Sequence, residues 1–456
     1  MAAIRLYCRR CGVLSLLLAF AAAVFGQGSL TPPVGPAPTM KTLAEVEPRT
    51  NLQSNPAPAG VDTTNADYHF IINQPGSYYL SAKLVVTKPH GIRINAPGVT
   101  LDLLGFEISR GAGSGGDAIS VKSDAYRAAV QNGSITGFAT GISAGTTHTC
   151  VYRNLRIGHC SSGGITAGEK ALVESCRVHD SGSGIYASFG SLLVNCSSTN
   201  TSGTGIFVAD GTTLKNCSVK ASGGIYGFYA GEGSILESCV ATNNRGSYAM
   251  YAAAGSTLTN CSASDNTATY GIFVGDRGVL TNCTASENRS SSTTSAGIGT
   301  NANARVSGCA STGNWSTVSL TIETIGMGFD IGPGSTVENC KASFNQGDGI
   351  RIRDETRAER NHSNNNGRGA GIHALGRGNH IEANVVIANS RGIDVDGINN
   401  LIVKNSASGN ATNYDLAANN RHGPIVDLTS TASPAVIGNS ALDTTSTDHP
   451  WANFAR

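Results

Sequence analysis

The sequence predicts an all-β fold, a right-handed single-stranded parallel β-helix that forms a solenoid of roughly 15 coils with a short N-terminal capping segment. Three observations lead to this prediction. A phrase recurs about every 22 residues, which is too short for a strand–helix–strand unit. Gly and Asn, the residues of tight turns, are abundant, with 57 Gly in 456 residues. Apolar residues keep a regular spacing, which disordered chains lack.

The N-terminal residues 1–26 have the features of a secretory signal peptide. Arg5, Arg9 and Arg10 form its positive region, and an apolar stretch follows at residues 13–24. The stretch is short for a membrane span, although an uncleaved anchor helix is the alternative. No later segment of the sequence is apolar enough to cross a membrane. The mature chain is therefore expected to have no transmembrane anchor and to be secreted or periplasmic.

The rest of the chain divides by composition. Residues 27–60 are rich in Pro and are predicted to be a linker. Residues 40–46 within it are expected to form a short helix that caps the solenoid, because an uncapped end exposes strand edges. The β-helix is predicted over residues 61–415, and residues 416–456 are predicted to be a C-terminal capping tail.

The repeated phrase shows how one coil is built. Residues 205–208 (Gly-Ile-Phe-Val) lead to residues 214–217 (Leu-Lys-Asn-Cys), and the frame restarts at Gly227 and Gly271. Each unit contains two or three short strands joined by turns, and stacked neighbours bury the apolar side that one unit cannot bury alone. Parallel crossovers favour a right-handed winding. One inward position is expected to form a continuous buried stack: Ile206, Phe228, Ile272, Phe329, Ile350, Ile372 and Ile393.

The cysteines recur with the coils. Cys196, Cys217, Cys239, Cys261 and Cys283 hold one place in the repeat, and Asn361, Asn384 and Asn405 later take about the same place. A column that accepts Cys or Asn favours a ladder of free, buried thiols at an inward corner. Disulfides are the alternative, because stacked strands are close enough for a bond. No paired CxxC spacing indicates a zinc site.

Strand alternation identifies the residues that leave the core. In residues 205–208 the two aliphatic side chains point inward, so Phe207 points outward. The aligned outward column begins with aromatic residues: Tyr186, Phe207, Tyr229, Tyr251 and Phe273. It continues with charged residues: Asp330, Arg351, His373 and Asp394. Arg353 and Asp396 stand in the next outward column.

The aromatic column has two interpretations. It is either a structural stack, which a terminal segment with Trp451 and Phe454 could cover, or a platform that binds sugar rings. An exposed row of this length would be a sizeable apolar patch, which usually marks a binding site. The five aromatic residues are therefore candidate substrate-binding residues.

The charged zone also has two interpretations, a solvated face with ion pairs or a site for an acidic polysaccharide. In the second, Arg351 and Arg353 bind carboxylates and His373 acts as a base. Asp330, Arg351, His373 and Asp394 are then the candidate catalytic residues, and Arg353 joins the substrate-binding residues. Asp394 and Asp396 could hold calcium, the one cofactor considered, or support inverting hydrolysis.

Several phrases resemble a known family. Residues 76–80, 99–106 and 132–135 look like the opening coils of the pectin-lyase-like superfamily, specifically the exported bacterial parallel β-helix repeat proteins, and residues 450–454 look like the end of some members. The resemblance implies the β-helix fold, which hosts lyases, hydrolases, epimerases, adhesins and inert spikes. The Asn-Thr-Asp, Asp-Asp and Gly-His-Gly elements of the similar pectin hydrolases are absent, so no catalytic residue is assigned by motif.

The resulting hypothesis is an exported, monomeric β-helix protein that binds a polysaccharide and processes it as a lyase, hydrolase or epimerase. The alternative is a non-catalytic surface or matrix protein whose solenoid is a rigid structural or adhesive spacer. The low charge, a formal net +1, excludes a polybasic surface, so nucleic acid is not an expected partner.

Overall fold

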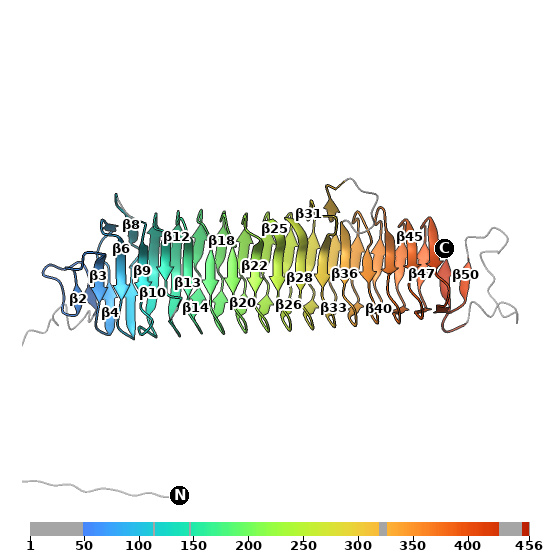
Figure 1. The fold of residues 1–456 in the computed structure, drawn as a ribbon, viewed down its shortest axis with the longest axis horizontal. Helices are drawn as coiled ribbons and strands as arrows, with labels where there is room; N and C mark the ends of the chain where they lie inside the picture. Colours follow the sequence, from blue (N-terminus) through green and yellow to red (C-terminus); the bar gives the residue numbers. More distant parts are fainter. Residues whose placement is uncertain (1–48, 113–114, 146, 319–325, 428–448, 456) are drawn as a thin grey trace, which may run out of the picture. The chain divides into compact units, whose positions relative to one another are not determined.

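The computed structural model describes residues 49–112, 115–145, 147–318, 326–427 and 449–455. The chain divides into two units, residues 1–48 and 49–456, and the described residues belong to the second. They form a parallel β-solenoid of about 16 turns, which confirms the predicted fold (Figure 1). Within this described part, no helix is long and apolar enough to span a membrane. The predicted signal peptide and cap helix lie outside the described residues.

A single coil contains three short strands. In one coil these are β19 (Ile206–Val208), β20 (Thr213–Lys215) and β21 (Ser218–Lys220). Each pairs in parallel with its counterpart in the next coil, β22 (Tyr226–Ala230), β23 (Ile235–Glu237) and β24 (Val240–Thr242). Three parallel stacks therefore run along the solenoid, and we call them the first, second and third stack in the order of their strands.

The first stack carries the candidate site. Its strands are β3 (Tyr68–Ile72), β6 (His90–Ile94), β9 (Asp117–Val121), β11 (Thr140–Ser143), β13 (Gly163–Ala167), β16 (Ile185–Ala187), β19, β22, β25 (Arg245–Ala252), β28 (Thr267–Val274), β32 (Ala296–Thr300), β36 (Met327–Ile331), β39 (Ile350–Ile352), β42 (Ala370–Ala374), β45 (Arg391–Val395) and β48 (Thr412–Leu416). The strands alternate inward and outward side chains, so one face lines the core and the other faces away from it.

The core follows the predicted register. Ile206 pairs with Phe228, and Phe329 pairs with Ile350. The seven residues of the expected inward stack are all fully buried: Ile206, Phe228, Ile272, Phe329, Ile350, Ile372 and Ile393. Each coil thus places an apolar side chain above that of its neighbour, and neighbouring coils exclude water from a continuous core.

The cysteine ladder is confirmed as buried free thiols. All ten cysteines among the described residues are buried and free. Eight of them precede the third-stack strands of successive coils, from Cys176 to Cys340. Asn361 continues this corner, because its Oδ1 accepts a 2.9 Å hydrogen bond from the backbone N–H of Cys340. Its Nδ2 in turn donates to Asn384 Oδ1 at 3.0 Å. The same corner therefore holds either a thiol or an amide.

A second amide ladder occupies the corner before the first stack, and sequence reasoning missed it. In one step of the ladder, Asn266 Nδ2 donates to Asn288 Oδ1 at 2.9 Å and Asn288 Oδ1 accepts from the Asn266 backbone. The members are Asn244, Asn266, Asn288, Asn314, Asn345, Asn366, Asn389 and Asn410. Side-chain amides therefore satisfy backbone groups that the turns leave unpaired.

The N-terminal end begins earlier than predicted. The strand β1 (Thr50–Asn51) pairs with β4 (Gly76–Tyr79), although residue 50 lies in the expected linker. The strand β2 (Val61–Asp62) is antiparallel to β3 and covers the edge of the first stack. The described end is thus capped by short strands, which reduces the number of unpaired edge groups.

The C-terminal end also extends beyond the predicted boundary at residue 415. The strand β51 (Asn453–Ala455) pairs in parallel with both β47 (Ser406–Ser408) and β50 (Ile425–Asp427). Asn453 continues the corner ladder, since Asn405 Nδ2 donates to its Oδ1 at 3.2 Å. The expected tail therefore contributes a strand to the solenoid, because its Asn supplies the amide that the last corner requires.

Candidate functional site

The predicted outward column exists as a continuous line along the first stack. Its residues pair directly from coil to coil: Thr166, Tyr186, Phe207, Tyr229, Tyr251, Phe273, Gly299, Asp330, Arg351, His373 and Asp394. The register predicted from the repeat is therefore correct over the whole candidate site.

The aromatic rings of this column stack on one another. Phe207 and Tyr229 have ring centroids 4.4 Å apart and an interplanar angle of 6°. The other steps, Tyr186–Phe207, Tyr229–Tyr251 and Tyr251–Phe273, have centroids 5.2 to 5.8 Å apart. Each ring thus covers the face of its neighbour, as expected for the structural interpretation of the column. A sugar approaching the middle of the ladder would meet ring edges and hydroxyls instead of an open platform.

A second ring ladder runs beside the first and was missed by sequence reasoning. Tyr226, Tyr248 and Tyr270 stack with centroids 5.6 and 5.8 Å apart. Each meets a ring of the first ladder edge-on, as Tyr226 does with Tyr229 at 5.0 Å and 69°. Strict alternation would have pointed Tyr226 inward, because it precedes Tyr229 by three residues. The available signal was a Tyr three residues before the column residue in three successive coils.

The terminal segments do not cover the rings within the described part of the chain. Trp451 lies against Lys404, with the ammonium nitrogen 4.4 Å from the ring centroid. Phe454 pairs with Ser406 in the third stack. The expectation that these aromatic residues cover the column is therefore wrong, because the amide ladder draws the C-terminal strand to a different stack.

Asp330 is the first charged residue after the rings and is held by two guanidinium groups. Arg351 Nη2 lies 3.1 Å from Oδ2, and Arg353 Nη1 donates to Oδ1 at 2.6 Å. The Tyr270 hydroxyl also donates to Oδ2 at 3.3 Å. Burial raises the pKa of Asp330, but the two arginines outweigh it and leave the pKa below its ordinary value. Asp330 is therefore an anion that links the aromatic and charged parts of the column.

His373 lies among three carboxylates. Its Nδ1 is 2.9 Å from Asp348 Oδ2, and its Nε2 is 3.1 Å from Asp396 Oδ2. Asp394 Oδ2 is 3.5 Å from Nε2. Burial lowers the pKa of His373, but the hydrogen bond to Asp348 and the surrounding negative charges raise it overall to about 9. The ring is a cation at neutral pH and donates from both nitrogens, so the expected role as a base does not fit this state.

Asp394 is buried between cations. Arg391 Nε lies 2.9 Å from its Oδ2, outside hydrogen-bond alignment, and His373 lies on the other side. Burial raises the pKa of Asp394 to about 6 against the effect of these cations. A calcium ion at Asp394 and Asp396 stays a prediction, and it would compete with two cations in a setting with fewer oxygens than calcium prefers.

The four predicted catalytic residues come together but face one another. Asp330, Arg351, His373 and Asp394 are each 2 to 5% exposed. The exposed side chains of the zone are the substrate-binding candidate Arg353, at 38%, and the metal candidate Asp396, at 60%. Sequence reasoning missed Asp348 and Arg391, which complete the ion pairs from the column beside the predicted one.

Open space lies at the two ends of the ring ladder. A hollow of about 450 Å³ separates the rings from the charged zone and is lined by Tyr248, Tyr270, Phe273, Asp276, Thr300, Asn301, Ala302, Asp330, Gly332, Pro333 and Arg353. Gly299 follows Phe273 in the column and makes room for the Tyr270 ring on the wall of this hollow: a Cβ there would lie 2.5 Å from Tyr270 Cε1. A hollow of about 540 Å³ adjoins Tyr186 and Phe207 at the other end.

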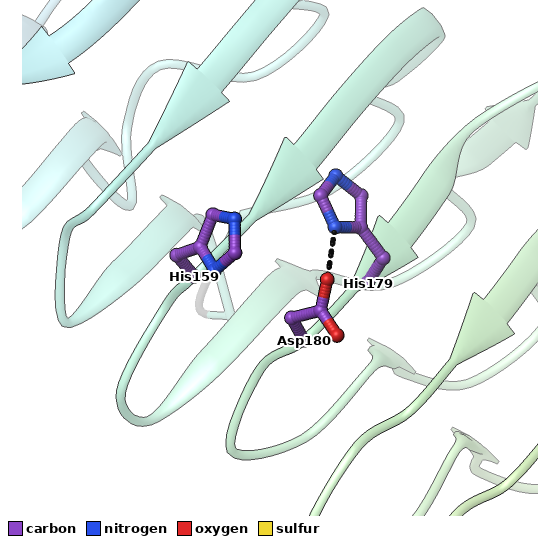
Figure 2. Close-up of side chains that lie close together, drawn as sticks. All are labelled: His159, His179 and Asp180. Atoms are coloured by element: carbon purple, nitrogen blue, oxygen red, sulfur yellow. Dashed lines mark hydrogen bonds and ion pairs between the residues drawn. The ribbon is translucent and has the colours of Figure 1, made fainter.

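A further group, away from the predicted site, lies in two early coils at the corner that follows the third-stack strands and precedes the next first-stack strands. Figure 2 shows Asp180 hydrogen-bonded to the ring of His179, with His159 beside them. One ligand atom from each of these residues lies within 4.8 Å of the others. Sequence reasoning followed strand positions only and did not align these corner residues.

Comparisons with known proteins place the fold. No curated protein matches the sequence. Similar solved structures include the A-module of the Azotobacter vinelandii mannuronan C-5 epimerase AlgE6, at 11% identity and a TM-score of 0.38, covering 73% of this chain and 90% of that chain. The periplasmic alginate epimerase AlgG has 11% identity and a TM-score of 0.33, covering 77% and 82%. The alginate lyase AlyF-OU02 has 10% identity and a TM-score of 0.35, covering 86% and 91%.

Solved structures with so little sequence identity do not indicate an activity. The match to a family model, in contrast, shows the family. The model of the right handed beta helix region matches residues 117–255, 164–300 and 249–411, overlapping ranges that together span more than half of the chain. These ranges contain the ring ladders, the charged zone and the corner group. The chain therefore belongs to the right handed beta helix family.

Proposed function

We propose that this chain is an exported protein that binds an acidic polysaccharide along the outward face of the first stack. The hollow of about 450 Å³ between Phe273 and Arg353 carries the proposal. It joins aromatic rings to a half-exposed guanidinium, and these are the two kinds of group that a chain of uronic acids requires. The hollow would be the anchoring subsite, with further sugars along the ring edges.

One guanidinium of the hollow is placed to bind an anion. Asp330, Arg351 and Arg353 together have an excess of one positive charge, which the Asp276 carboxylate on the wall of the hollow offsets, so the recognition of an anion rests on Arg353 itself. The Arg353 side chain is 38% exposed and can turn from Asp330 toward a ligand carboxylate. A guanidinium binds a carboxylate through two parallel hydrogen bonds, which gives orientation as well as affinity.

The rings shape the other side of the hollow. Tyr270 and Phe273 meet edge-on at 4.9 Å, and Gly299 adds no side chain at the next place in the column, where the edge of the Tyr270 ring lies instead. At that place no aromatic residue covers Phe273 from the following coil, because Gly299 is its register partner. A sugar can therefore contact the end of the ladder here, in contrast to its middle, where the neighbouring rings cover each face.

The chemistry of the zone supports binding more directly than proton abstraction. His373 holds a proton at neutral pH, because its pKa is raised to about 9. Burial, followed by the charge of Asp330, raises the pKa of the Tyr270 phenol, which also keeps its proton. Both groups are donors in this state. Lyase, hydrolase or epimerase activity would therefore need a ligand that opens the ion pairs.

Binding can be tested with a glycan array that contains uronic-acid and neutral polysaccharides. We expect the protein to bind acidic glycans, and Arg353→Gln to weaken that binding at least tenfold. Gly299→Ala should have a similar effect, because the added Cβ would displace the Tyr270 and Phe273 rings that line the hollow. Arg305→Gln is the matched control: Arg305 is an exposed arginine that pairs with Glu338 away from the first stack. Equal loss with Arg305→Gln, or equal affinity for neutral glycans, would contradict the proposal.

Product analysis with the bound glycan then tests turnover. Chain cleavage or epimerisation that disappears in Arg351→Gln and His373→Gln would assign the charged zone to catalysis. The rigid spacer is the second candidate function, and one observation favours it. The rings cover each other, and four of the charged residues are at most 5% exposed. Failure to bind any glycan would leave the spacer as the better account.

A further inference from the structure

The corner group is built from equivalent places in two successive coils. The strand β12 (Val151–Gly158) ends just before His159, and β15 (Arg177–His179) ends just before Asp180. Gly158 pairs with His179, so His159 and Asp180 follow paired positions. The parallel register therefore brings two imidazoles and one carboxylate to one corner, as Figure 2 shows.

The distances are close to those of a metal site. His179 Nδ1 lies 2.9 Å from Asp180 Oδ2, and the rings of His159 and His179 are 5.5 Å apart at 87°. One ligand atom of each residue lies within 4.8 Å of the others. Tetrahedral ligands at about 2.1 Å from an ion are about 3.4 Å apart. Closing the group around an ion thus requires side-chain shifts of roughly an ångström, which partly exposed rings can make.

The surroundings hold two of the ligands in place. A Cβ at Gly158 would lie 2.3 Å from Cε1 of His179, so this glycine leaves the space that the ring occupies. The Asn200 amide donates a short hydrogen bond to Asp180 Oδ1. The other carboxylate oxygen of Asp180, Oδ2, therefore faces His179. Such outer contacts orient ligands at metal sites and fix which atom points to the ion.

The group is accessible from two sides. A hollow of about 580 Å³ is lined by His159, His179 and Arg156 among others. Another of about 550 Å³ is lined by His159, Asp180 and Asn200 among others. An ion held by the three side chains would keep an open position toward these hollows, where water or a ligand oxygen completes a tetrahedron.

We propose that His159, His179 and Asp180 form a binding site for a divalent transition-metal ion of the zinc class. Two imidazole nitrogens and one carboxylate oxygen suit zinc, nickel or copper, whereas calcium and magnesium prefer sets of oxygen ligands. Because the ligands come from two coils, the ion also links those coils and adds stability to the folded state.

Isothermal titration calorimetry of the full chain with ZnCl₂ at pH 7.5 tests the site. We expect a one-to-one site that weakens at least tenfold in His159→Ala and in His179→Ala. The control His362→Ala, which removes an exposed histidine on the third-stack strand β41 (His362–Asn364), should leave the site unchanged. Zinc should also raise the melting temperature of the wild type and of the control, but not of the two ligand variants.

Gly158→Ala separates a formed site from adsorption on surface histidines. It keeps all three ligands but displaces the His179 ring, so zinc should bind at least fivefold more weakly, while adsorption would not change. Cobalt substitution should give the visible absorption of a tetrahedral ion in the wild type and in His362→Ala, but not in the two ligand variants. A titration with CaCl₂ is the third arm. No zinc binding, zinc binding that survives His159→Ala, or a preference for calcium at this corner would each overturn the proposal.

Discussion

At the residue scale, His373 shows how a side chain on an outward column becomes part of a closed network. Its ring is 5% exposed and touches the carboxylates of Asp348, Asp394 and Asp396. The register follows from the repeat, so the sequence predicts the place of His373. Its charge state depends on Asp348, which stands in the neighbouring column, and on burial by side chains of adjacent coils.

This environment gives stability a definite dependence on pH. The pKa of His373 is about 9 in the folded state and 6.5 without its neighbours. Its contribution is therefore fully present below pH 6.5 and is lost as the pH rises through 9, with an upper size of about 3 kcal/mol. Urea unfolding at pH 7 and at pH 9.5 should show a smaller loss in His373→Gln than in the wild type. His362→Gln is the control and should keep the wild-type loss.

Asp394 is charged when it loses its proton, whereas His373 is charged when it holds one, and the two groups titrate in separate pH windows. Its pKa is raised to about 6 from 3.8, so the folded state favours the protonated carboxyl and stability falls as the pH rises from about 4 to 6. Measurements above pH 7 therefore separate the His373 titration from that of Asp394. An identical pH dependence in His373→Gln and wild type would contradict the charged state that the three carboxylates impose.

At the element scale, the ring ladders make the central coils depend on each other. The Tyr229 ring contacts the rings of Phe207, Tyr226 and Tyr251. Among the described residues, the Tyr186 ring contacts only that of Phe207. Two extra ring pairs are worth about 1–3 kcal/mol beyond buried area. Tyr229→Ala should therefore lower the free energy of unfolding by about 1–3 kcal/mol more than Tyr186→Ala.

Urea unfolding followed by circular dichroism measures this difference. Tyr229→Phe is the matched control, since it keeps the ring and removes only the hydroxyl, and it should remain close to the wild type. Equal losses in Tyr229→Ala and Tyr186→Ala would show that ring contacts along the ladder add little to stability. The loss of unfolding free energy in Tyr186→Ala would in that case come from partial burial of the ring against its own strand.

The strands also show what the sequence can predict. A period that repeats Gly-Ile-Phe-Val fixes the coil, the inward stack and the whole outward column, because parallel register carries each position to the next coil. The second ladder was missed because Tyr226 breaks strict alternation. The corner group of His159 and His179 was missed because corners follow turn geometry, which varies from coil to coil. Burial of the charged column depends on contacts between columns, which a repeat pattern does not contain.

At the scale of the whole molecule, the solenoid is a linear array in which each coil contacts its neighbours. Stability in such arrays is a sum of coil and interface contributions, so the ends open more readily than the centre. The buried thiols report on this behaviour, since they lie in many successive coils from Cys150 to Cys340. Burial raises the pKa of Cys176 to about 12, so at pH 8 only about one Cys176 side chain in 10⁴ is ionised in the folded state.

Alkylation at pH 8 in moderate urea should therefore occur only when a coil opens. We expect Cys150 and Cys340, which lie nearest the ends of the thiol series, to react at least about tenfold faster than Cys239 at its centre. This ratio corresponds to a difference of about 1.4 kcal/mol in the free energy of opening. Peptide mapping by mass spectrometry after timed alkylation measures each site. A single rate for all thiols would contradict this expectation. It would mean that the coils open together, with the ring ladders and amide ladders joining them into one cooperative unit.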